Sequence, residues 1–155
     1  MRLNLGAVIV PVMISRADML WPCAMLIEVT SKALSQLRAH AAAAHPLEAC
    51  GILLGDGARI TAARPAANVH STPATHFEID PQALIDAHRA ARSGGGQVIG
   101  YYHSHPVGEA APSATDRASA AGDGRVWAII AGDEVRFWLD GEAGFSPLPL
   151  SLIDG

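Results

Sequence analysis

His103 and His105 are separated by a single serine, and after a short loop they are followed by Ser113 and Asp116. If the segment that ends at His105 is a β-strand, side chains two residues apart point to the same face, so both imidazoles face one point. A carboxylate from the next element would add an oxygen to these two nitrogens. Two nitrogens and one oxygen form a catalytic zinc set whose fourth position is left for water. The spacing is therefore compatible with a metal site at the end of this strand, and the alternative on these residues alone is two polar side chains at a strand end.

The second half of this pattern also has an account without catalysis. Ser113 followed three residues later by Asp116, ahead of an apolar helix, is a capping box. The two roles are compatible, because a capped helix start holds its first-turn carboxylate rigidly. A capping serine accepts a hydrogen bond, which leaves its O–H free to donate elsewhere.

The hydrophobic pattern predicts the elements that position these residues. We expect strands over residues 25–29, 50–54, 58–66, 97–103, 126–130 and 135–139, with an edge segment over 145–152 and a short extended piece over 76–79. We expect helices over residues 31–44, 80–92 and 113–121, the first ended by His45-Pro46 and the second opened by Asp80-Pro81. This order predicts an α/β fold: one domain with a mixed sheet and helices on both sides.

The composition narrows the class of protein. The chain has 155 residues, of which 17% are charged, and its formal net charge of −4 contains no long run of either sign. Nucleic acid is therefore not expected as a partner, because phosphate binding needs clustered Lys and Arg. The two cysteines, Cys23 and Cys50, form no disulfide framework, and we expect a reducing, cytoplasmic setting.

The first 24 residues stand apart from the pattern that begins near Met25. The apolar run over residues 5–13 is too short to span a bilayer, so we expect no membrane partner. A thin charged region before the run, and Pro11 within it, favour a non-targeting segment over a signal peptide. We treat residues 1–24 as an N-terminal extension and residues 25–155 as the domain.

The combination of motifs resembles the JAMM metallopeptidases, also called the MPN+ family. His-x-His-Pro, a gap, and then Ser-x-x-Asp are present with the family's spacing, and so is an upstream glutamate before an apolar strand, Glu48-Ala-Cys-Gly-Ile-Leu-Leu-Gly. The strand Val98-Ile-Gly-Tyr-Tyr, together with Asn68 and Phe77-Glu-Ile-Asp-Pro81, is similar to the small single-domain bacterial members. The resemblance covers residues 25–150. It implies the MPN fold, which is similar to that of the cytidine deaminases.

The resemblance also implies a role for each site residue. His103, His105 and Asp116 would bind one Zn²⁺, Glu48 would act as general base and then general acid, and Ser113 would donate to the tetrahedral oxyanion. Glu109 in the motif loop is a rival for the base, but Glu48 lies beside a buried strand, and catalytic groups work best on rigid elements.

Four other side chains are expected to support the structure or the site without taking part in the chemistry. Ser104 should point to the opposite face of the strand, and Cys50 should be a small buried hydrophobe. Trp127 is expected in the core or an interface, together with Trp138, and not in a binding site.

The family cleaves amide bonds after the C-terminal Gly-Gly of ubiquitin or ubiquitin-like proteins. The small bacterial members resemble enzymes that process ubiquitin-like sulfur carriers, so this resemblance implies such a carrier as partner. The carrier, the leaving group, and the choice between monomer and homodimer stay open. A catalytically silent MPN scaffold is the alternative, and a zinc nucleobase deaminase is disfavoured because its His-x-Glu and Pro-Cys-x-x-Cys signature is missing.

Overall fold

The computed structural model describes residues 26–155, so the expected extension over residues 1–24 lies outside the described part of the chain. Strand β1 (Ile27–Thr30) leads directly into helix α2 (Ser31–Ala44). Thr30 is the N-cap, because its Oγ1 accepts a hydrogen bond from the N–H of Ala33 at 3.1 Å. The helix ends before His45-Pro46, as the sequence predicts.

The remaining strands build one mixed sheet. They are β2 (Cys50–Asp56), β3 (Arg59–Ala66), β4 (Gln97–Ser104), β5 (Val126–Ala131), β6 (Glu134–Gly141), β7 (Gly144–Leu148) and β8 (Leu150–Ile153). The strand order is β7-β6-β5-β4-β2-β3-β1-β8. The pairs β4–β5, β1–β3 and β1–β8 are parallel and the others are antiparallel, which confirms the predicted mixed sheet.

The prediction of a single edge segment over residues 145–152 is wrong. This stretch forms two strands, β7 and β8, which pair at opposite edges of the sheet and are separated only by Pro149. One intervening residue keeps the two strand ends within roughly 7 Å, so the sheet must curl until its edges approach each other. The carbonyl of Pro149 accepts a hydrogen bond from the N–H of Ile27 at 3.0 Å.

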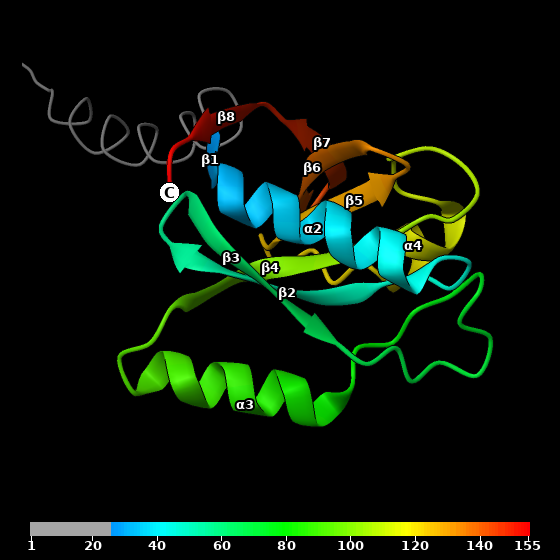
Figure 1. The fold of residues 1–155 in the computed structure, drawn as a ribbon, viewed down its shortest axis with the longest axis horizontal. Helices are drawn as coiled ribbons and strands as arrows, with labels where there is room; N and C mark the ends of the chain where they lie inside the picture. The colour runs from blue at the N-terminus through cyan, green and yellow to red at the C-terminus, as the bar shows by residue number, and fades with distance from the viewer. Residues whose placement is uncertain (1–25) are drawn as a thin grey trace, which may run out of the picture.

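Helices cover both faces of the sheet, as predicted (Figure 1). Leu53 of β2 packs in one cluster with Leu34 and Leu37 of α2. The neighbouring Ile52 points to the other face and packs with Ala87 of α3 (Pro81–Arg92). Alternation along one strand therefore separates the two layers.

Helix α4, the segment over residues 76–79 and Gly100 shape the part of the fold around the predicted site residues. Helix α4 (Ala114–Ser119) is shorter than predicted, and the segment over residues 76–79, expected as a short extended piece, forms one bridge, between Asn68 and Ile79. Gly100 allows β5 to lie close to β4, because a Cβ there would collide with the backbone of Val126.

Within residues 26–155, no helix has the length and apolar character needed to span a membrane.

Candidate active site

The end of β4 and the start of α4 bring two imidazoles and one carboxylate together. His103 Nε2 lies 3.1 Å from His105 Nε2 and 3.1 Å from Asp116 Oδ2, and His105 Nε2 lies 3.2 Å from the same oxygen. The backbone N–H of His105 donates to the carbonyl of Ile130 at 2.8 Å, which continues the β4–β5 alignment past the end of the strand. The structure thus brings together the residues that the sequence singles out.

Asp116 is held in place by the helix start. Its backbone N–H donates to Ser113 Oγ at 3.0 Å, and its Oδ2 accepts from the backbone N–H of Ser113 at 2.9 Å. This is the predicted capping box. The carboxylate is only 4% exposed, so the cap fixes the oxygen that faces the two imidazoles.

The two imidazoles are held in different ways, His105 through its second nitrogen and His103 through its ring. His105 Nδ1 lies 2.7 Å from the carbonyl of Glu109, so it carries the proton and leaves the Nε2 lone pair directed at Asp116 and His103. The ring of His103 stacks on Phe77, with centroids 4.3 Å apart, and meets Trp127 edge-on at 5.7 Å. Its Nδ1 is buried and has no hydrogen-bond partner in the described part of the chain.

Burial and mutual contact set the protonation of this cluster. Burial lowers the pKa of His103. Burial would also lower the pKa of His105, but the hydrogen bonds to Asp116 and to the Glu109 carbonyl raise it. Burial would raise the pKa of the Asp116 carboxyl, yet the contacts with both histidines and the Ser113 N–H hold it well below its ordinary range. Asp116 is therefore an anion that faces two nitrogens.

The residues present fit a divalent metal ion. Their three donor atoms form a nearly equilateral triangle with edges of 3.1–3.2 Å. Tetrahedral ligands at 2.0–2.1 Å from zinc are separated by roughly 3.3 Å, which is close to these edges. Two nitrogens and one anionic oxygen are also a donor set that zinc prefers. No other group of three or more such side chains converges in the part of the chain that the structure describes.

Glu48 lies just before β2 and is held by its backbone. Its N–H donates to the carbonyl of Pro73 at 2.8 Å, and its carbonyl accepts from Asn68 Nδ2 at 3.1 Å. The next residue, Ala49, donates its N–H to Ser104 Oγ at 2.8 Å. Ser104 is thus structural, as expected, and it fastens the histidine strand to the segment that carries Glu48.

As a whole residue, Glu48 is 7% exposed. Burial and the nearby Asp116 raise its pKa to about 7, although His105 opposes the rise. The rival Glu109 has an exposed side chain, and it contributes its carbonyl to His105 instead.

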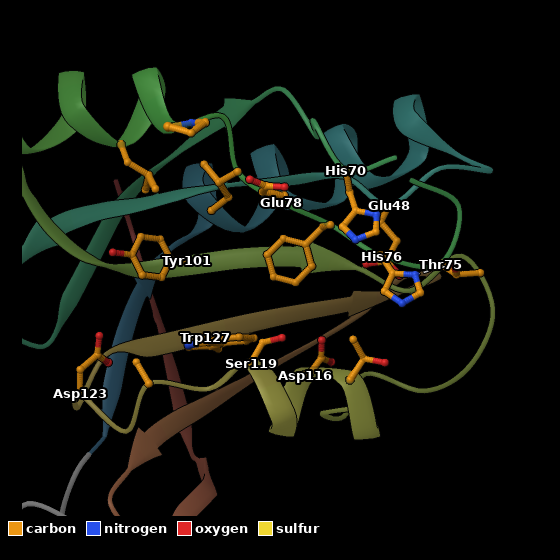
Figure 2. A pocket seen from close by; sticks show the side chains of 16 residues that line it. Glu48, His70, Thr75, His76, Glu78, Tyr101, Asp116, Ser119, Asp123 and Trp127 are labelled. Atoms are coloured by element: carbon orange, nitrogen blue, oxygen red, sulfur yellow. Dashed lines mark hydrogen bonds between the residues drawn. The ribbon is translucent and has the colours of Figure 1, made fainter. Parts of the chain in front are cut away.

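Two cavities meet at Glu48. The larger, about 550 Å³, extends from Glu48 and Asp116 along Trp127 to Tyr101, with side chains arriving from both sides (Figure 2). The smaller, about 390 Å³, is lined by Glu48, Ser113 and the motif loop. Glu48 therefore borders both cavities, and the donor triangle reaches the larger through Asp116 and the smaller through His105.

The sequence pattern does not predict all of the residues that line this cavity or contact the histidines. Trp127 is buried as expected, but it also lines the larger cavity. Phe77 stacks on His103, one of the expected metal ligands. Trp138 donates its Nε1–H to the carbonyl of Ala110 at 3.2 Å and so fastens the motif loop. Periodicity marks a tryptophan as buried but does not show which polar group it touches. The same pattern predicts an extended piece over residues 76–79 but not the contact of Phe77 with His103.

Residues 30–140 match a family model described as prokaryotic homologs of the JAB domain. The desampylase of Haloferax volcanii is 43% identical over 102 residues, which cover 64% of this chain and 73% of that protein. A probable TtuB-protein conjugate cleaving protease of Thermus thermophilus is 37% identical over 83 residues. That match covers 54% of this chain and about half, 55%, of the relative.

Solved structures share the fold. A protein of Desulfitobacterium hafniense is 30% identical, with a TM-score of 0.73 over 84% of this chain and 94% of its own. A JAB1/MPN domain protein of Archaeoglobus fulgidus, at 17% identity, has a TM-score of 0.52 over 81% of this chain and 96% of its own. The expected fold class is thereby confirmed.

Proposed function

Because the chain belongs to the prokaryotic JAB-domain family, we propose that it is a zinc-dependent peptidase and isopeptidase. Its substrate would be the amide bond that follows the C-terminal Gly-Gly of a ubiquitin-like protein, of the sulfur-carrier kind. The observation that supports this most strongly is the triangle of His103, His105 and Asp116 beside a buried glutamate. The names of the two curated relatives, a desampylase and a conjugate cleaving protease, point to the same class of reaction.

His103, His105 and Asp116 would hold one Zn²⁺. When bound, zinc supplies Lewis-acid chemistry and lowers the pKa of a water from 15.7 to about 7. The chain's own contribution is to fix the donors before the ion arrives, through the Ser113 cap and the Glu109 carbonyl. A preformed donor set leaves little ordering to be done on binding.

Glu48 would move the proton. Its carboxylate would take a proton from the attacking water and later give it to the leaving amine nitrogen, and burial, which raises the pKa of Glu48, favours the protonated form that the second transfer needs. The position between the two cavities suits this task, because the leaving group departs on one side of Glu48 while the acyl part stays on the other.

Ser113 would stabilise the developing charge. Its Oγ accepts the N–H of Asp116, so its hydroxyl proton is free to donate. The acceptor would be the carbonyl oxygen of the scissile amide as that oxygen becomes negative. Loss of one such donor typically lowers the rate by about 10²–10³-fold.

A Gly-Gly tail suits a narrow site, because it has no side chains to place. Such a tail would lie extended and be held through its backbone, beside the loop over residues 68–77 that borders the larger cavity.

The test uses ubiquitin-like carriers with C-terminal extensions after Gly-Gly, and carriers joined to a lysine side chain, with products identified by mass spectrometry. We expect cleavage directly after Gly-Gly that a chelator abolishes and zinc restores. A folded protein that contains no zinc and takes none up would contradict the proposal and favour a scaffold that only binds partners.

A further inference from the structure

Two imidazole rings outside the metal triangle line the larger cavity together with Glu48. His70 and His76 belong to the loop between β3 and α3, and their rings stack with centroids 4.7 Å apart and an interplanar angle of 11°. Figure 2 shows both rings beside Glu48 at the end of the cavity that holds Asp116. Neither ring takes part in the proposed zinc binding or proton transfer.

The backbone fixes which nitrogen of His70 carries the proton, and two hydroxyls lie beside the corresponding nitrogen of His76. The backbone N–H of Thr72 donates to His70 Nδ1 at 3.0 Å, and because a backbone N–H can only donate, the neutral His70 ring is protonated at Nε2. The hydroxyls of Thr75 and Thr72 lie 2.8 and 3.2 Å from His76 Nδ1, and His76 has the same tautomer as His70 when one of these hydroxyls donates to that nitrogen. Each ring then has one N–H left to offer.

Charged donors are missing from the described lining of the cavity, and its other side-chain donors are the hydroxyls of Thr75, Tyr101, Thr115 and Ser119 and the indole N–H of Trp127. Its lining includes the carboxylates of Glu48, Glu78, Asp116 and Asp123, but no Lys or Arg among the described residues. An ionised carboxylate only accepts hydrogen bonds, so it cannot bind a peptide carbonyl. A Gly-Gly tail presents nothing but backbone N–H and C=O groups, and each buried C=O needs a donor.

We propose that His70 and His76 are a substrate-binding donor pair, whose Nε2–H groups bind carbonyl oxygens of the tail that leads to the reacting bond. This inference rests on the proposed function and adds to it the groups that recognise a tail without side chains. It assigns the pair to binding and leaves the proton transfer to Glu48.

One side chain connects the pair to Glu48. Asn68 Oδ1 accepts from the backbone N–H groups of His70 and Glu78 at 3.1 and 3.0 Å. Its Nδ2 donates to the carbonyls of His76 and Glu48 at 3.0 and 3.1 Å. The two rings and the proposed base therefore share one anchor, and a substrate carbonyl meets donors that are already in place.

In the test, each histidine is replaced in turn by phenylalanine, whose ring can still stack but has no N–H group. In His70→Phe and His76→Phe we expect KM for a Gly-Gly carrier fusion to rise about 3- to 10-fold each, with kcat changed less than about twofold, because the lost contact serves binding alone. His76→Gln, which restores a donor, should recover part of the KM. His88→Phe on α3, outside the cavity, is the matched control and should behave as wild type.

A second measurement leaves the pair unmutated. In a Glu48→Gln protein, an uncleaved carrier fusion should shift the NMR signals of Nε2–H in His70 and His76, and the signal of His88 should stay in place. If wild type cleaves the fusions while the Phe variants keep a wild-type KM, or the ring signals do not move, the donor pair is wrong and the proposed function stands. If wild type cleaves no fusion, the proposed function fails and the donor pair with it.

Discussion

Asp116 uses one oxygen for two purposes. Its Oδ2 accepts the N–H that caps α4 and is also the oxygen closest to both imidazoles. A capped carboxylate cannot rotate away from the histidines without losing the cap. The residue that starts the helix therefore also sets the geometry of the proposed metal site.

Asp116→Asn separates these two purposes. The amide oxygen can still accept the Ser113 N–H, but a neutral oxygen is a poor partner for a cation, so we expect the variant to fold and to lose stoichiometric zinc after dialysis, as measured by metal analysis. Ser113→Ala is the matched change: it should keep zinc, lose about 1 kcal/mol of stability through the cap, and lose activity about 10²–10³-fold. Full zinc retention by Asp116→Asn would remove Asp116 from the ligand set.

Glu48 should make stability depend on pH in the metal-free protein. Burial raises its folded-state pKa from 4.5 to about 7, so between these values the folded state binds more protons than the unfolded state and the free energy of unfolding falls as pH rises. Glu48→Gln does not ionise and escapes this loss. We expect the variant to match wild type at pH 4 and to be about 1–3 kcal/mol more stable at pH 8, after allowance for solvent screening.

Urea unfolding in the presence of a chelator, at several pH values, measures the difference in the free energy of unfolding between wild type and Glu48→Gln. The chelator matters because a bound cation would lower the pKa of Glu48 and hide the effect. The same variant should bind zinc and show no turnover. A stability difference that stays constant from pH 4 to pH 8 would mean that Glu48 is not held in a charge-disfavouring environment.

Among the elements, the loop between β3 and α3 depends on one residue. Asn68→Ala removes hydrogen bonds to the backbones of Glu48, His70, His76 and Glu78 at once. We expect a loss of about 2–3 kcal/mol in the free energy of unfolding, because the freed backbone groups are only partly reached by water. We also expect a higher KM together with a lower kcat, since the donor pair and the base both move.

Thermal unfolding and steady-state kinetics check this prediction. Gln82→Ala is the matched control, because it removes an exposed side-chain contact with Asp86 in the same region of the chain. A variant of Asn68 with unchanged kcat would show that Glu48 is positioned by Ser104 and Pro73 alone.

The sequence could predict the elements that carry the site because each is encoded locally. Thr30, Asp80 and Ser113 cap their helices as their types predict. The split at Pro149 could not be predicted, since the pairing of β7 and β8 with different neighbours is set by the curl of the whole sheet. The Phe77 stack on His103 depends likewise on a long-range contact, which periodicity does not encode.

At the scale of the whole molecule, the proposed site joins three regions far apart in the sequence. Glu48 precedes β2, the histidines end β4, and Asp116 starts α4. The sheet fixes the first two relative to each other through β2–β4 pairing, in which Cys50 lies opposite His103. Helix α4 is short and joins the sheet through the motif loop, so a bound ion would connect its start to the sheet.

Metal removal should therefore lower the stability of the whole domain as well as the activity. An ion that binds only the folded state, present at about 1,000 times its dissociation constant, stabilises by about 4 kcal/mol, which for a domain of this size corresponds to about 8–15 °C in Tm. In calorimetry of the wild-type protein, we expect a chelator to lower Tm by about this amount and added zinc to restore it. Asp116→Asn should start near the lower Tm and be insensitive to the chelator. An equal response of both proteins would place the stabilising ion somewhere other than the triangle of His103, His105 and Asp116, because the ion would then act through residues that the substitution leaves intact.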